Sequence, residues 1–171
     1  MLPSAPGKSL SSWISELDNP GKLSHLCIDF FLEEVGSALA ALHLERIYLD
    51  PTNSDIRKLR TCIHGDLHSN NIFFDLKMLQ VTFIDSAGIG ASWLDPKSPE
   101  LDFFLMIRSL QMEISSKELK YLKFSRMCEA FFKGYKSKVP AFLHPSIDEV
   151  ISDFTALSSR VTPKLSLSSE H

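Results

Sequence analysis

The fold is decided by residues 62–72, which read CIHGDLHSNNI, together with residues 83–88, which read FIDSAG. Two short β-rich runs, at 71–75 and 80–85, connect these stretches through a polar-ended turn. Two such runs at this spacing predict an antiparallel hairpin. The first stretch is therefore a loop that enters a hairpin, and the second is the loop that leaves it.

Three oxygen-bearing side chains are predicted to meet at the open end of this hairpin. Asp66 and Asn71 lie in the entering loop, and Asp85 ends the partner strand. Their carboxylate and amide oxygens are hard ligands that suit Mg²⁺, which binds one or two carboxylates plus substrate phosphates. Phosphoryl transfer needs such parts, because a carboxylate must accept the hydroxyl proton and metal ligands must hold ions against the phosphates.

The rest of the chain is predicted to be helical. Apolar spacing and capping residues indicate helices at about 10–18, 24–44, 99–111, 115–136 and 146–157, with a further helical turn within 53–59. Ser24 is a candidate cap, and both Ser115-x-x-Glu118 and Ser146-x-x-Glu149 have the form of a capping box. The expected fold class is α+β and mostly helical, with one central β-hairpin that carries the catalytic and metal-binding loops.

Composition indicates a globular protein. The chain has 171 residues and a formal charge of −3, so net charge does not favour binding to nucleic acid or to a membrane surface. No apolar run approaches the roughly 18 residues of a spanning helix, and residues 1–8 do not have the form of a secretory signal. The cysteines, Cys27, Cys62 and Cys128, are unclustered and fit a reducing compartment. We therefore expect a cytoplasmic protein that binds neither nucleic acid nor membrane.

A known family shares this pattern of residues. The order His-x-Asp-x-x-x-x-Asn, then an apolar hairpin and an Asp-x-x-Gly-like turn, resembles the catalytic core of protein-kinase-like enzymes. The form HGDLHxxN at 64–71 resembles the aminoglycoside phosphotransferase and choline kinase family, whose members phosphorylate small molecules. One departure is Ser86, because these kinases commonly carry Phe or another large residue after the metal-binding Asp.

The resemblance implies roles for individual residues. Asp66 and His64 are the implied catalytic residues, with Asp66 as the base and His64 as the brace of the catalytic loop. Asn71 and Asp85 are the implied Mg²⁺ ligands. Phe73 and Ile84 are implied to form the apolar floor under the adenine. His68 and Asp102 are implied to steady the catalytic loop. The pair Gly134-Tyr135 also resembles a Gly-Tyr feature of a late helix in these proteins.

Only the C-terminal lobe of the family is matched. Phosphoryl transfer also needs a glycine-rich loop, a strand Lys and a helical Glu, and no such loop is found before residue 63. We interpret residues 1–22 as a hinge-like linker with a short helix, 23–157 as the kinase-like C-lobe and 158–171 as a flexible tail. The N-lobe is expected to be missing from this chain.

Three functions follow as hypotheses. The first is a phosphotransferase that uses ATP and Mg²⁺ on a small-molecule hydroxyl and has weak or no activity as this chain alone; ATP and GTP are not distinguished. The second is a non-catalytic binding or regulatory lobe, or half of a split kinase that pairs with an N-lobe on another chain. The third, an atypical protein kinase, ranks lower because such kinases usually carry another residue where His68 stands.

Several features of the sequence also have simpler interpretations. Gly7-Lys8-Ser9 is not a P-loop, because Leu2 occupies the position of the required glycine. Asp102 could act as a charge near a helix start as well as a loop brace. The basic residues of one predicted helix are expected to form a solvated face; they are Lys117, Lys120, Lys123 and Arg126.

Overall fold

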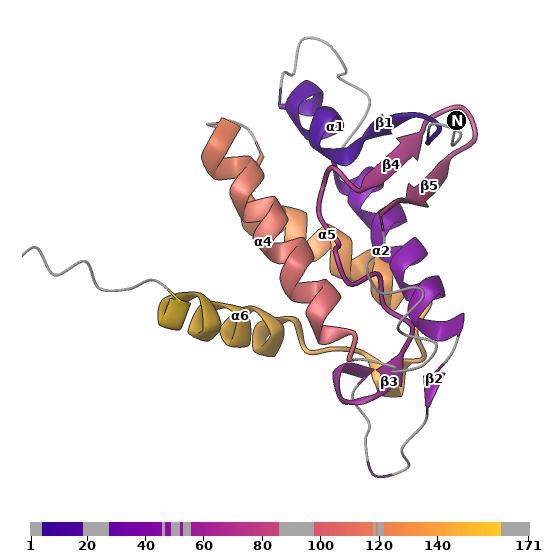
Figure 1. Cartoon of the computed structure of the whole chain (residues 1–171), viewed down its shortest axis with the longest axis vertical. Coiled ribbons are helices and arrows are strands. Elements are labelled where there is room, and N and C mark those ends of the chain that lie inside the picture. The colour runs from indigo at the N-terminus through magenta and orange to yellow at the C-terminus, as the bar shows by residue number, and fades with distance from the viewer. Residues whose placement is uncertain are drawn as a thin grey trace, which may run out of the picture.

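A computed structural model describes residues 5–18, 28–45, 47–48, 52, 56–85, 98–117, 119 and 122–161 of the chain. The described part is α+β and mostly helical (Figure 1). Its helices are α1 Leu10–Leu17, α2 Ile28–Glu45, α4 Glu100–Lys117, α5 Phe124–Lys136 and α6 Ile147–Val161, with short 3₁₀ turns at Ile56–Lys58 and Ala141–Leu143. Its strands are β1 Lys8–Ser9, β2 Ile47–Tyr48, β3 Arg60–Thr61, β4 Ile72–Asp75 and β5 Gln80–Phe83.

The predicted hairpin is confirmed. Strands β4 and β5 pair antiparallel, with Ile72 opposite Phe83 at the open end. The turn between them is closed by Asp75, whose carboxylate accepts the backbone N–H of Lys77 at 2.8 Å. Strand β1 adds a third strand on the other edge of β4, in a segment that the sequence indicated only as extended.

Helices α2 and α5 pack against each other at very short range. A Cβ at Gly36 of α2 would lie 2.0 Å from the carbonyl oxygen of Phe131, and one at Gly134 of α5 would lie 1.8 Å from that of Glu33. Only glycine fits at these two points. Helices α5 and α6 both contact α4, and α6 extends away from the lower end of α4 in the view of Figure 1.

An aromatic core joins the sheet to the helices. Phe74 of β4 packs on Phe31 of α2 with ring centroids 4.7 Å apart, and Trp13 of α1 packs on Phe31 at 5.0 Å. Because alternate side chains of a strand point to opposite faces, burial of Phe74 leaves Phe73 on the face away from α2. The loop at 62–71 runs from β3 to β4 alongside α4, which fixes its position relative to this core (Figure 1).

Some predicted boundaries were wrong. Ser115 lies inside α4, which runs on to Lys117 with no break, and the next helix starts only at Phe124. Helix α6 continues to Val161, so the first residues of the predicted tail are helical. The cap at Ser146 is confirmed, because its hydroxyl accepts the backbone N–H of Glu149 at 3.4 Å, whereas the Glu149 carboxylate pairs with Arg57.

Other predictions concern residues outside the described part. These are the Ser24 cap, Glu118, the loop from 86 to 97 with its glycine turn, and the tail beyond Val161. None of the described helices combines the length and the apolar character that crossing a membrane requires.

Candidate functional site

Asp66 and Asn71 are in direct contact. The Asn71 amide nitrogen donates to the backbone carbonyl of Asp66 at 3.1 Å and to its carboxylate at 3.2 Å. The backbone N–H of Asn71 donates to the carbonyl of His68 at 2.8 Å and closes the turn between them. Asn71 is buried, whereas the Asp66 side chain is half exposed. The loop therefore presents one carboxylate to solvent and orients it with a buried amide.

The fully buried Asp102 of α4 fixes the backbone at the start of this loop. Its two carboxylate oxygens accept the N–H groups of His64 at 2.7 Å and Gly65 at 2.8 Å. Gly65 has φ +83°, a left-handed conformation that favours glycine. Two adjacent N–H groups can meet one carboxylate because the chain turns sharply at this glycine.

Asp102 also has a partner on α2. His43 is fully buried, and its Nε2 lies 3.0 Å from the Asp102 carboxylate. The other ring nitrogen lies 2.8 Å from the hydroxyl of Tyr135 on α5. With the carboxylate as acceptor, Nε2–H donates to Asp102, and Nδ1 forms the hydrogen bond with Tyr135. The chain of hydrogen bonds connects α5, α2 and α4 to the backbone of the loop.

His64 joins the loop to the end of the hairpin. Its Nε2 lies 2.9 Å from the carbonyl oxygen of Ile84, and the N–H of Asp66 donates to its Nδ1 at 3.3 Å. An acceptor at Nδ1 and a donor at Nε2 define a neutral imidazole. Burial lowers the pKa of His64 below its ordinary value, against the opposing effects of Asp102 and the Ile84 carbonyl. Geometry and burial thus both favour the uncharged ring.

Asp85 leaves the hairpin at the same end. Its neighbour Ile84 donates its backbone N–H to the carbonyl of Asn71 at 3.0 Å, so the ladder continues one residue past β5. Asp85 itself is exposed and has φ +52°, which Asp adopts more readily than most residues. Ile84 is therefore held by hydrogen bonds to both Asn71 and His64, and the chain turns abruptly at the next residue, Asp85.

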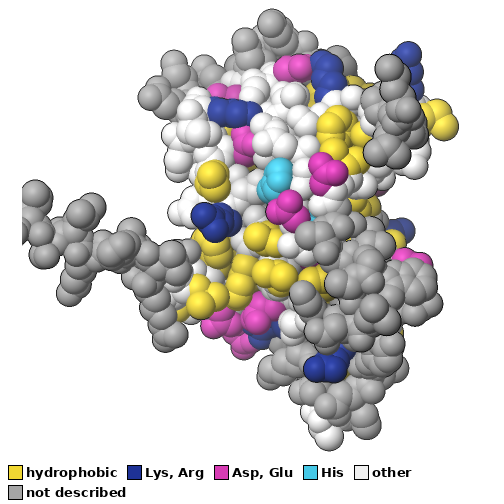
Figure 2. Space-filling model, in the orientation of Figure 1, with side chains coloured by type: hydrophobic (Ala, Val, Ile, Leu, Met, Phe, Trp, Pro, Cys, Tyr) yellow, Lys and Arg dark blue, Asp and Glu magenta, His cyan; other side chains and the backbone are white. Residues whose placement is uncertain are grey.

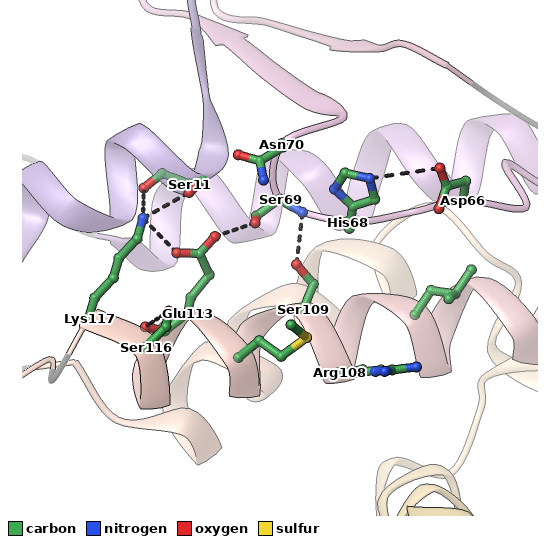
Figure 3. A pocket seen from close by; sticks show the side chains of 12 residues that line it. Ser11, Asp66, His68, Ser69, Asn70, Arg108, Ser109, Glu113, Ser116 and Lys117 are labelled. Atoms are coloured by element: carbon green, nitrogen blue, oxygen red, sulfur yellow. Dashed lines mark hydrogen bonds and ion pairs between the residues drawn. The ribbon is translucent and has the colours of Figure 1, made fainter.

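A cavity of about 490 Å³ opens between the loop and α4 (Figure 3). Asp66 and His68 line it from the loop, with the His68 Nε2 3.7 Å from the Asp66 carboxylate. The space-filling view shows this face, where a histidine lies among acidic side chains and hydrophobic side chains lie next to them (Figure 2). The remaining lining residues are Ser11, Ser69, Asn70, Leu105, Arg108, Ser109, Met112, Glu113, Ser116 and Lys117.

Ser69 holds the far end of the loop against α1 and α4. Its N–H donates to the Ser109 hydroxyl at 2.8 Å, its carbonyl accepts the N–H of Ser11 at 3.2 Å, and its hydroxyl donates to Glu113. The other oxygen of Glu113 lies 2.6 Å from the Lys117 ammonium, which also donates to the Ser11 carbonyl at 2.7 Å. Lys117 is therefore a structural cation, not part of the solvated face that the sequence indicated.

Glu113 is ionised by this network. Burial alone would raise the pKa of Glu113, but hydrogen bonds from Lys117, Ser69 and Ser11 outweigh burial and hold it below its ordinary value. The negative charge of Glu113 is thus balanced by the Lys117 ammonium. Among the described residues, Asp66 is the other carboxylate that lines the cavity, and no Lys or Arg side chain forms an ion pair with it.

The structure separates the predicted site residues into two groups. Asp66, Asn71, His64 and Asp102 are joined by hydrogen bonds, and His68 lies beside Asp66. Phe73 and Ile84 are half-buried at the hairpin and do not line the cavity, so the expected adenine floor lies apart from it. No three or more His, Cys, Asp or Glu side chains within the described ranges form a group that could hold a metal ion.

Several residues of the site were missed in the sequence. His43 stands in an apolar helix pattern, and its partners Asp102 and Tyr135 lie 59 and 92 positions away. Glu113 and Lys117 have the i, i+4 spacing of a helical ion pair, which was the one available signal. Ser69 and Ser109 gave no signal, because serine is common in loops and on exposed helix faces.

No protein-family model and no curated protein matches this sequence.

Proposed function

We propose that this chain carries the catalytic half of a phosphotransferase that acts on the hydroxyl of a small molecule. The observation that supports it best is Asp66, a half-exposed carboxylate that is oriented by Asn71 at the wall of a cavity. Its loop is fixed by the buried Asp102, and such a fixed position is what a general base needs. The resemblance of residues 64–71 to the aminoglycoside phosphotransferase and choline kinase family supports the same function.

In the proposed reaction, the acceptor lies in the cavity with its hydroxyl at Asp66. The carboxylate takes the hydroxyl proton while the hydroxyl oxygen bonds to the γ-phosphorus of ATP. The bond from that phosphorus to the bridging oxygen breaks, and ADP leaves with the bond's electron pair. The Asn71 amide donates to the Asp66 carboxylate and keeps it aligned, and neutral His64 holds the Asp66 backbone through Nδ1.

The residues at the hairpin end fit Mg²⁺ by their chemistry. Asn71 donates through its amide nitrogen, which leaves its amide oxygen for a ligand, and Asp85 supplies an exposed carboxylate. One carboxylate with neutral oxygens and substrate phosphates is a usual Mg²⁺ environment. Bound there, Mg²⁺ would neutralise phosphate charge, and Asn71 and Asp85 would hold it. Since no larger ligand group exists among the described residues, we expect the phosphates to complete the site.

A thermal-shift titration tests this proposal. Mg²⁺ with a non-hydrolysable ATP analogue at 100 times its Kd would add about 2.7 kcal/mol of stability, which raises the Tm by several degrees. We expect the shift to require Mg²⁺ and to be lost in Asp85→Asn. Asp148→Asn, an exposed Asp on α6, is the matched control and should keep the shift. No shift in a folded protein would contradict the proposal.

A second candidate is a non-catalytic binding lobe, or one half of a split kinase. The feature that favours it is in the sequence, where residues 1–63 contain no glycine-rich loop of the kind that covers the phosphates in these kinases. The same titration separates the two, because a non-catalytic lobe would give no Mg²⁺-dependent shift. For the catalytic half, we expect turnover only after an N-lobe that supplies a phosphate-covering loop is added, and no turnover with Asp66→Asn.

A further inference from the structure

The charge of the cavity wall indicates the kind of acceptor that it would take; this inference rests on the proposed function. The wall formed by α4 carries Arg108, with Leu105 one turn before it and Met112 one turn after it. Within the described residues, the Arg108 guanidinium has no hydrogen bond or ion pair. The wall therefore presents a cation between two apolar side chains.

The other charges of the cavity do not favour a cationic ligand. Glu113 is buried and already bound by Lys117 and Ser69, so it has little capacity left to attract a ligand cation. Asp66 is the remaining carboxylate, and in the proposed reaction it faces the acceptor hydroxyl. Figure 3 shows Arg108 on the α4 side of the cavity and Asp66 on the loop side. A molecule that places its hydroxyl at Asp66 could thus place another group at Arg108.

The geometry points to an acceptor that carries an acid group on an apolar body, with its hydroxyl at Asp66 and its carboxylate or phosphate at Arg108. Leu105 and Met112 would contact the apolar body, and the exposure of Met112 leaves its surface available. An acid group at Arg108 gains a charge-assisted hydrogen bond, whereas an ammonium group there is repelled. The cavity is expected to reject polycationic acceptors.

Three six-carbon alcohols that differ in the group at the end opposite the hydroxyl, and hence in charge, test this inference. They are 6-hydroxyhexanoate, hexane-1,6-diol and 6-aminohexan-1-ol, each titrated into the ¹⁵N-labelled full chain and followed by amide chemical shifts. We expect the hydroxy acid to bind about fivefold more tightly than the amino alcohol, the ratio expected of one exposed ion pair. The shifted amides should be those of Ser69, Ser109 and Ser116, which line the cavity.

Variants assign the preference to Arg108. Arg108→Gln should abolish the difference between the acid and the amine, and Arg60→Gln, an exposed Arg outside the cavity, should keep it. Equal or tighter binding of the amino alcohol, or no binding of any of the three, would overturn the inference. If that result is obtained but Mg²⁺ and the ATP analogue still raise the Tm, only the assignment of the acceptor fails. If neither the preference for the hydroxy acid nor the Mg²⁺-dependent rise in Tm is seen, the proposed function fails too.

Discussion

The carboxylate of Asp102 accepts the backbone N–H of His64 at 2.7 Å, across 38 positions of sequence. The same carboxylate also binds Gly65 and His43, so it accepts three hydrogen bonds without exposure to solvent. A buried carboxylate is stable only when it is satisfied in this way. The position of the candidate base Asp66 thus depends on one side chain that never touches the cavity.

Asp102→Asn should destabilise the protein strongly. The amide would turn an NH₂ group toward backbone N–H donors, which leaves buried donors unpaired. We expect the free energy of unfolding to fall by about 3 kcal/mol, because such a change breaks a buried hydrogen-bonded charge network. Urea unfolding measures it, with Asp148→Asn on the surface as the matched control. A loss for Asp102→Asn no larger than that of the control would contradict the role given to Asp102.

The hairpin and most helices could be predicted because their signals are local. The runs at 71–75 and 80–85 are β-rich and joined by a turn, and α2, α5 and α6 have apolar residues at helical spacing. The boundary at Ser115 failed for a non-local reason. Glu113 and Lys117 bind Ser69 and Ser11, which come from distant parts of the chain and support the last turn of α4. A capping pattern cannot report such contacts.

The candidate site was predictable only where a family pattern covers it. The order of residues from His64 to Asn71 indicated a loop that carries a base and a metal ligand. The supports of that loop are side chains brought together by the packing of α2, α4 and α5, notably His43 and Tyr135. No spacing along the sequence encodes these contacts, since each depends on which helix faces which.

The contact between α2 and α5 predicts a large effect of a single methyl group. Gly134→Ala would place a Cβ 1.8 Å from the carbonyl oxygen of Glu33, so the two helices must move apart. We expect a loss of about 3 kcal/mol in the free energy of unfolding, at the upper end of overpacking effects. Ser125→Ala on the exposed face of α5 is the control and should change stability by less than about 0.5 kcal/mol. A Gly134→Ala protein as stable as the control would show that the helices are not in such close contact.

His64 predicts a pH dependence of stability. Because its pKa in the folded protein lies below its ordinary value of 6.5, the unfolded chain takes up the proton first as the pH falls. Its contribution to stability is therefore fully present above 6.5 and is lost as the pH falls below 6.5 toward the folded pKa. Urea unfolding at several pH values should show this loss.

Two measurements attribute the loss to His64. In His144→Asn the slope of stability against pH should persist, and in His64→Asn it should become smaller. If His64→Asn does not fold, the imidazole ¹⁵N shifts of the parent protein report the tautomer directly. A protonated Nδ1 in His64 at a pH above 6.5 would contradict both the hydrogen bond from Asp66 and the predicted pH dependence.

The ion pair between Glu113 and Lys117 should be worth more than a surface pair of the same length. Glu113 is buried, and the pair closes at 2.6 Å, whereas Lys133 and Glu33 close at 2.7 Å with the Lys133 side chain 73% exposed. Double-mutant cycles with Glu→Gln and Lys→Met should give a coupling energy of about 1–2 kcal/mol for the first pair. The exposed pair should give a much smaller coupling energy, because solvent screens it.

The same pair also makes the stability of the fold sensitive to low pH. The pKa of Glu113 is held below its ordinary value of 4.5, so its contribution to stability is present above 4.5 and is lost as the pH falls through the folded pKa. Glu113→Gln should remove this part of the acid sensitivity and lower stability at neutral pH, because Lys117 then loses its charged partner. Because the Ser69 hydroxyl donates to the Glu113 carboxylate, the variant should also shift the amide resonance of Ser69 in the loop. Equal coupling energies for the two pairs, with no change at Ser69, would show that Glu113 does not support the loop that carries Asp66.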